Sequence, residues 1–137
     1  MRALAIDYGD ARTGFSISDP TGLLATSLTT YHERGARRVA EQAAAYVLQF
    51  GADRIVLGMP KNMNNTLGKR AEQTLFFRDL LHDILPDIPI ILWDERSTTI
   101  SATAILNETN VRGKKRKNVI DTVAASVILQ SYLDSVR

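Results

Sequence analysis

A chain of 137 residues, 45% hydrophobic and 23% charged, has the length and composition of one globular domain and can bury a hydrophobic core. The absence of cysteine excludes a disulfide framework, a thiol nucleophile and a cysteine-ligated zinc site, and two histidines fifty residues apart form no ligand cluster. The net charge of +2 is too small to indicate a partner, and no apolar run approaches the ~20 residues that cross a membrane, so we expect a cytoplasmic protein.

The first half of the chain predicts three strands and then a helix. Residues 3–7, 14–18 and 23–31 have the apolar or alternating pattern of strands, and the short turns between them predict an antiparallel meander. From residue 36 onward the apolar residues recur with the period of a helix, and Gly51 provides its stop signal. We expect the buried face of this helix to extend to Leu48.

The next segment predicts two buried strands separated by a helix. Residues 55–57 form a short strand that leads into Gly58, and residues 88–93 form the fifth strand. Between them, residues 69–85 predict a helix whose core face includes Phe77.

Two more helices complete the predicted fold. A short one over residues 97–106 can be capped by Ser97, and Asn118 can cap the last one. In that last helix the expected buried side chains are Ile120, Ala124, Val127 and Ile128. The order of elements predicts an α/β fold in which a mixed five-stranded sheet carries helices on both faces.

Acidic residues stand where buried strands end and on the apolar face of the last helix. Asp7 follows the first strand, Asp94 and Glu95 follow the fifth, and Asp121 lies one turn before two alanines of the last helix. Carboxylates in such places cost desolvation free energy unless a positive group meets them. Their oxygens suit Mg²⁺, and two such ions about 4 Å apart can activate a water and stabilise a leaving oxygen in phosphodiester cleavage.

Each of these acids also has a purely structural interpretation. Asp7 can cap a turn, and Asp94 and Glu95 can favour the positive end of the helix that follows them. Asp121 stands near a capping-box position after Asn118. Judged from the residues alone, a metal site and a set of caps are both open.

Four segments of the chain form a set of motifs. They are Asp7-Tyr-Gly9 with Arg12-Thr-Gly14, Gly58-Met-Pro60 with Asn62-Met63, Trp93-Asp-Glu-Arg-Ser-Thr-Thr99, and Lys114–Ala125 with Ile128-Leu-Gln130. In this order, and over essentially the whole chain, they resemble the YqgF (RuvX) family of small bacterial nucleases. That family is described as Holliday junction resolvases and as pre-16S rRNA processing nucleases. Lys61 and Asn64-Asn65 depart from the usual pattern of the family.

The resemblance implies a single ribonuclease H-like domain over residues 1–137, with sheet order 3-2-1-4-5 and an antiparallel second strand. It implies a metal-dependent nuclease, a hydrolase acting in ribosome biogenesis through rRNA processing, in Holliday junction resolution, or in both. The catalytic and metal-binding acids would be Asp7, Glu95 and Asp121, with Asp94 as a weaker alternative to Glu95 and with Mg²⁺ or Mn²⁺ as cofactor. Gly58 would end the strand between those of Asp7 and Glu95 and would leave that gap unobstructed.

The expected partner is structured RNA or branched DNA, and no membrane. Thr98 and Thr99 would open a helix whose free N–H groups suit a phosphate, and Arg96 could clamp a phosphate or pair with Asp94. Five of the six residues from Arg112 to Lys117 are basic; such a run is a solvated loop in most proteins, but here it leads into the helix of Asp121. The nucleic-acid-binding candidates are Arg12, Lys61, Arg96, Thr98, Thr99, Arg112, Lys114, Lys115, Arg116 and Lys117.

Two other classes of function fit part of the sequence. The run from Asp7 to Gly14 also resembles the phosphate loop of actin-like and sugar-kinase-like ATPases, but those bind ATP between two such domains and only one fits in 137 residues. A non-catalytic nucleic-acid-binding factor of ribosome assembly, with an idle acid triad, is the other alternative. Symmetric cleavage of a four-way junction would require a homodimer, because it needs two active sites.

Overall fold

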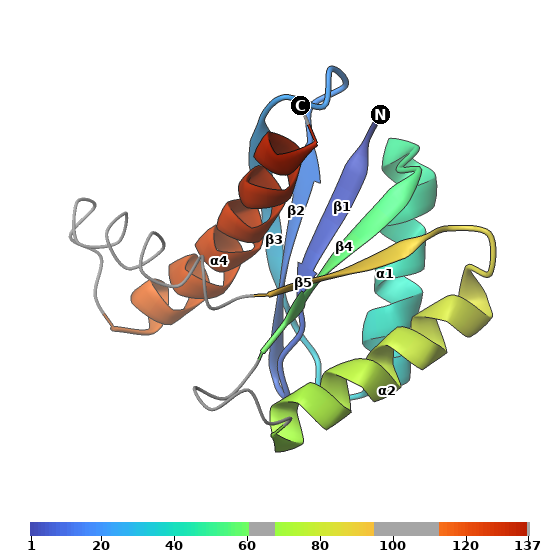
Figure 1. The fold of residues 1–137 in the computed structure, drawn as a ribbon. Helices are drawn as coiled ribbons and strands as arrows, with labels where there is room; N and C mark the ends of the chain where they lie inside the picture. Colours follow the sequence, from blue (N-terminus) through green and yellow to red (C-terminus); the bar gives the residue numbers. More distant parts are fainter. Residues whose placement is uncertain (61–67, 95–112, 137) are drawn as a thin grey trace.

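The computed structural model describes residues 1–60, 68–94 and 113–136, with side chains described from residue 123 onward in the last segment. Its elements are β1 (Ala3–Asp7), β2 (Arg12–Ser18), β3 (Ala25–His32), α1 (Ala36–Phe50), β4 (Arg54–Met59), α2 (Lys69–Ile84), β5 (Ile90–Asp94) and α4 (Gly113–Ser135) (Figure 1). The five strands and the first two helices agree with the predicted ones to within a few residues. The short helix predicted over 97–106 lies outside the described residues.

The five strands form one sheet in the order β3-β2-β1-β4-β5. The β1–β2 and β2–β3 pairs are antiparallel, whereas the β1–β4 and β4–β5 pairs are parallel. This confirms the predicted mixed sheet and its order. Because β1, β4 and β5 are parallel, all three end at the same edge of the sheet, which we call the carboxyl edge.

Alternation along the strands divides the core into two layers. Leu4 and Ile6 belong to the layer covered by α1 and α2, whereas Ala3 and Ala5 belong to the layer covered by α4. Figure 1 shows α4 on one side of the sheet and the other two helices on the opposite side. We call these the α1/α2 face and the α4 face, and the face on which a side chain lies can be read from its place in the strand.

The buried stripe of α1 is narrower than predicted. Ala43 and Val47 are buried, but Leu48 is 79% exposed, so its predicted place in the core is wrong. Residues four apart in an α-helix are offset by about 40° around its axis. At the step from Ala44 to Leu48 this offset takes the side chain out of the buried face. The stop signal is correct, because Gly51 takes a left-handed conformation with φ of 67° and caps the helix.

Helix α4 begins earlier than predicted, at Gly113 instead of after Asn118. Lysine and arginine are good helix formers, and here they extend the helix through the basic run that would be a loop in most proteins. Of the predicted buried side chains, Ile128 is fully buried as expected, whereas Ala124 and Val127 are only half-buried. Ala125 and Leu129, which were not predicted, are fully buried as well. Within the described ranges, no helix is both long and apolar enough to cross a membrane.

Candidate active site

Asp7 is the last residue of β1 and lies on the α4 face at the carboxyl edge, two residues after Ala5 in the alternation of the strand. Its neighbour across the antiparallel pair is Gly14 of β2. On the other side, Ile6 pairs with Leu57, so the next residue of β4 in the same register, Gly58, lies beside Asp7. The carboxylate therefore stands between two residues that have no side chain.

A row of residues crosses the sheet on the α4 face at this level. In strand order it reads Thr30, Gly14, Asp7, Gly58 and Trp93. Neither glycine has a side chain to project beside the carboxylate on this face, whereas a larger residue at either place would do so. Sequence reasoning identified Gly58 and missed Gly14. The available signal was the short turn after Asp7, which places Gly14 opposite Asp7 in an antiparallel hairpin.

Asp94 ends β5 at the same edge but lies on the opposite face. Ile91 and Trp93 of this strand pack in the α4 layer, and Ile90 packs in the α1/α2 layer. Alternation then places Asp94 with Ile90, away from the face of Asp7. The two described acids at strand ends are thus separated by the sheet itself.

Arg12 begins β2 on the α4 face, two residues before Gly14. The turn that delivers it is tight: a Cβ added to Gly9 would collide with the carbonyl oxygen of Arg12. The N–H of Gly9 also donates to Oγ1 of Thr13 at 3.4 Å. These contacts fix the backbone of the turn, so the side chain of Arg12 starts from the same face and the same edge as that of Asp7.

Polar contacts along α4 fix its position on the sheet. Ser126 Oγ lies 2.7 Å from Ser27 Oγ of β3 and donates to Ser16 Oγ of β2 at 3.3 Å. Further along the helix, Gln130 Oε1 accepts a hydrogen bond from the N–H of Ala25 at 2.9 Å. The helix is therefore held in register with β2 and β3 by side chains of its own.

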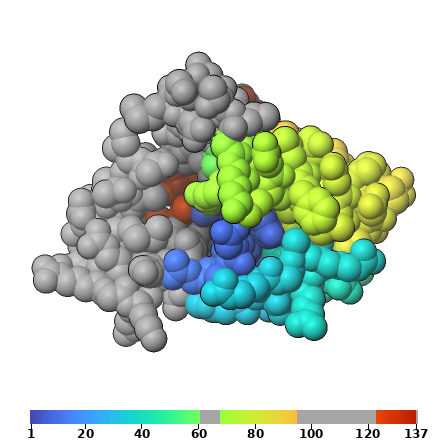
Figure 2. Space-filling model, turned by 90° about the horizontal axis from the view of Figure 1, so that it is seen from below, coloured from blue at the N-terminus to red at the C-terminus, as the bar shows by residue number. Residues whose placement is uncertain are grey.

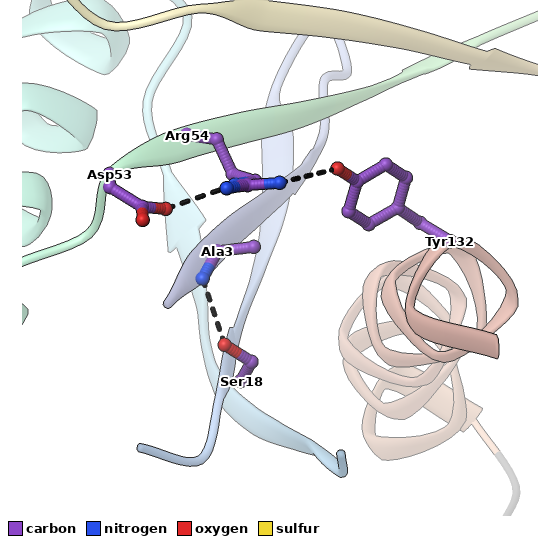
Figure 3. A network of polar contacts seen from close by, with 5 residues as sticks. All are labelled: Ala3, Ser18, Asp53, Arg54 and Tyr132. Atoms are coloured by element: carbon purple, nitrogen blue, oxygen red, sulfur yellow. Dashed lines mark hydrogen bonds and ion pairs between the residues drawn. The ribbon is translucent and has the colours of Figure 1, made fainter. Parts of the chain in front are cut away.

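A second set of contacts attaches α4 to β4 and β5. Tyr132 Oη accepts from Nη1 of Arg54 at 3.0 Å, and Arg54 also pairs with Asp53 at 3.0 Å (Figure 3). Trp93 Nε1 donates to Ser131 Oγ at 3.2 Å, and its ring meets that of Tyr132 edge-on at 5.6 Å. The end of β5 is thus tied directly to α4.

We expect Trp93→Phe to lower the free energy of unfolding by about 1 kcal/mol, because Ser131 loses its hydrogen bond while an aromatic ring is kept. Urea unfolding of the variant would measure the loss. Ser131→Ala removes the same bond, so the double variant should be scarcely less stable than either single one. Additive losses would show that Trp93 acts through packing alone.

The other predicted site residues fall into two groups. Asp121 and the run Lys114–Lys117 belong to α4, but their side chains lie outside the described part of the structure. The remaining predicted residues lie outside the described residues altogether: Lys61, Glu95, Arg96, Thr98, Thr99 and Arg112. Among the residues that are described, no three potential metal ligands come together.

Comparison with known proteins gives matches over almost the whole chain. A family model described as "RuvX: Holliday junction resolvase" matches residues 1–135. A "Putative pre-16S rRNA nuclease" of Acetivibrio thermocellus is 44% identical over 136 residues, covering 98% of this chain and 96% of its own. A protein of the same name from Clostridium novyi is 39% identical over 136 residues, covering 99% and 100%.

Solved structures of similar fold include Holliday junction resolvases. RuvC of T. thermophilus, in complex with a Holliday junction substrate, has a TM-score of 0.64 at 12% identity and covers 99% of this chain and 95% of its own. The yeast mitochondrial Holliday junction resolvase has a TM-score of 0.59 at 10% identity, with coverages of 96% and 77%. At these identities the likeness shows the fold, and it confirms the predicted ribonuclease H-like architecture.

Proposed function

The chain belongs to the RuvX family of nucleases, and we propose that it cleaves structured nucleic acid with divalent metal ions held by Asp7, Glu95 and Asp121. The observation that carries this proposal is the position of Asp7. Its carboxylate lies at the carboxyl edge, between Gly14 and Gly58, on the face covered by the helix that contains Asp121. An acid that only capped a turn would not need a flank free of side chains on both sides.

The donor set suits Mg²⁺ or Mn²⁺. All three acids offer carboxylate oxygens, which are the ligands that such hard cations prefer, and the two glycines leave space for the ion's remaining waters. When bound, the ion supplies an acidified water and positive charge at the phosphate. The protein's part is to fix the carboxylates and to orient the phosphate, and Arg12 is placed to contact a phosphate next to Asp7.

The anchors of α4 support the inclusion of Asp121. Ser126 contacts Ser16, and Gln130, four residues later, contacts the residue paired with Ser18, so the helix runs alongside β2. Going back five residues from Ser126 covers ~7.5 Å of helix. Going back two residues from Ser16 to Gly14 covers ~7 Å of strand. Position 121 is thereby expected at the level of Asp7.

The orientation of β5 supports Glu95 over Asp94 as the second ligand. Asp94 lies on the α1/α2 face, across the sheet from Asp7. Because successive residues of a strand alternate between faces, the acid that follows Asp94 is the better candidate for the α4 face. The preference for Glu95 then has a geometric reason in addition to the family resemblance.

The proposed substrates follow from the names of the relatives. We propose precursor 16S rRNA as the substrate in ribosome biogenesis and a four-way DNA junction as the second one, both met in the cytoplasm, with a homodimer required for symmetric junction cleavage. The basic run Lys114–Lys117 forms the start of the helix that leads to Asp121, so it is placed to grip the backbone near the cleaved bond. Arg12, Lys61, Arg96, Thr98, Thr99 and Arg112 are proposed as further nucleic-acid contacts.

The test is a cleavage assay on both substrates, in Mg²⁺ and in EDTA, with the wild-type protein and two matched variants. We expect cleavage in Mg²⁺ only, and we expect Glu95→Gln to reduce its rate at least ~100-fold, since loss of a group that merely supports a metal ligand already costs ~10–100-fold. Asp94→Asn, one residue away, should keep most of the rate. A larger loss of rate in Asp94→Asn than in Glu95→Gln would make Asp94 the ligand instead. Cleavage in EDTA would show that the reaction needs no divalent metal ion.

A further inference from the structure

A hollow of about 520 Å³ lies near the carboxyl edge, on the α1/α2 side of the sheet. It is lined by the turn after β1, by Arg34 before α1 and by the first two turns of α2. Figure 2 shows the β1–β2 turn, in blue, between the start of α2, in yellow-green, and the start of α1, in cyan. Its volume falls within the ~300–1,000 Å³ of typical ligand pockets. We call it the Phe76 pocket.

The pocket contains an aromatic side chain that the core does not use. Phe76 is 60% exposed, whereas its neighbour Phe77 is fully buried. Phe77 stacks on Tyr8 with ring centroids 4.3 Å apart, and both rings pack against the α1/α2 layer. The pocket thus has a fixed wall, which is Tyr8 held by Phe77, and an exposed ring that is free to stack with a planar ligand.

The polar groups of the pocket carry both signs of charge. Asp10 and Glu72 bring carboxylates, Arg34 and Lys69 bring cations, and Gln73 brings an amide. Lys69, Gln73 and Phe76 stand at positions i, i+4 and i+7 of α2, so they share one helix face. Because two carboxylates balance the two cations, the pocket has no net charge to attract a phosphate into it, and the carboxylates can accept hydrogen bonds from the N–H groups of a ligand.

Two further observations connect this pocket with Asp7. Tyr8 directly follows Asp7, and its carbonyl oxygen accepts a hydrogen bond from Nη2 of Arg70 at 3.4 Å, which places a cation against the backbone next to Asp7. Tyr8 also lines the pocket, so one short stretch of backbone joins the pocket to the end of β1 at Asp7. A strand that passes from one site to the other would meet the cation on the way.

We propose that the Phe76 pocket receives one unpaired nucleobase of the substrate strand, close to the cleaved bond, stacked on Phe76 with an amino-bearing edge toward Asp10 and Glu72. Lys69, Arg34 and Arg70 would contact the phosphates on either side of that base. The inference rests on the proposed function, because it assumes that the scissile phosphate lies at Asp7. It adds a specificity site for adenine, guanine or cytosine over uracil, whose pairing edge has no amino group.

The test measures binding in EDTA, so that its readout does not depend on cleavage. A single-stranded oligonucleotide series, each member with one abasic position, is titrated by fluorescence anisotropy against wild type, Phe76→Ala and Phe76→Tyr. For wild type we expect one abasic position to weaken binding about fivefold or more, the lower end of what stacking on an aromatic side chain contributes. Phe76→Ala should lose that sensitivity, and Phe76→Tyr should restore it. Leu48→Ala is the control: it removes an exposed apolar side chain from a different helix, α1, and should keep the wild-type profile.

Uracil and cytosine are then compared at the sensitive position, where cytosine should bind more tightly and Glu72→Gln should narrow the difference. A flat abasic profile, or a profile unchanged in Phe76→Ala, would overturn the pocket even if the protein cleaves its substrates in Mg²⁺. A preference for uracil would overturn the proposed orientation of the base. Sensitivity that depends on Phe76 in a protein that fails to cleave would support the pocket and contradict the nuclease assignment.

Discussion

Asp7→Asn should reduce metal-dependent cleavage at least ~100-fold while leaving the fold intact. The amide has nearly the shape of the carboxylate but lacks the negative charge that a divalent ion requires. Because Asp7 lies between Gly14 and Gly58, no neighbouring side chain within the sheet can take over its place. Rates would be measured on precursor rRNA and on a four-way junction at equal protein concentration.

Asp83→Asn is the matched control for this variant. Asp83 is an exposed carboxylate in the last turn of α2, on the other side of the sheet, and its loss should leave the rate unchanged. Cleavage that persists in highly purified Asp7→Asn would remove Asp7 from the catalytic machinery. If the variant instead failed to fold, Asp7 would be a structural cap of the β1–β2 turn.

Replacing Lys114, Lys115, Arg116 and Lys117 together by serine should weaken binding of unrelated sequences by similar factors. These residues bind the nucleic-acid backbone in our proposal, so the slope of log affinity against log salt should shrink by ~0.7–0.9 for each phosphate that the variant no longer neutralises, and by up to ~3.6 if all four contacts are lost. Anisotropy titrations at several salt concentrations would give the slope. Circular dichroism would show whether the start of α4 remains helical, since serine is the weaker helix former.

Arg78→Ser serves as the control for general charge loss, because Arg78 lies on α2 and pairs with Asp79 at 3.2 Å. Its salt slope should equal that of wild type. An unchanged salt slope in the variant with all four replacements would show that the basic run is a solvated helix end that does not bind the nucleic-acid backbone.

The pattern of periods in the sequence was sufficient for a mixed five-stranded sheet, whereas the order of its strands came from the family resemblance. Two short turns after residues 7 and 18 favour antiparallel neighbours, and each later strand follows a helix, the usual connection between parallel strands. The position of Asp7 at a sheet edge follows from the same pattern. Residue spacing also located Asp121 on the helix, but not its level relative to Asp7, which depends on the contacts of Ser126 and Gln130 across more than 100 residues of chain.

Other features depend on tertiary contacts that no local pattern reveals. Helix α4 begins at Gly113, so the basic run belongs to the helix. From the sequence, Asn118 resembles an N-cap, and the predicted helix therefore began only there. The face of Asp94 is fixed by the packing of Ile91 and Trp93 in the α4 layer, and an uninterrupted run of four apolar residues before it does not reveal which face is which. The place of Gly14 beside the carboxylate of Asp7 follows only from the pairing of these two residues in the sheet.

The central claim is that Asp7, Glu95 and Asp121 converge on one metal site, and like charges that converge repel each other when no metal is bound. Asp121→Asn relieves that repulsion, so in EDTA the variant should be at least as stable as wild type near neutral pH. Mg²⁺ at ten times its dissociation constant should stabilise wild type by about 1.4 kcal/mol, and the variant by clearly less. As a simple helix cap, Asp121 would contribute about 0.3–1 kcal/mol of its own, with no difference in response to Mg²⁺.

Thermal unfolding of wild type and Asp121→Asn, each in EDTA and in a series of Mg²⁺ concentrations, separates these two accounts in one experiment. A shared metal site predicts that the variant melts at the same or a higher temperature in EDTA and that Mg²⁺ raises the melting temperature of wild type more than that of the variant. A variant that melts lower in EDTA and responds to Mg²⁺ as wild type does would contradict the shared site.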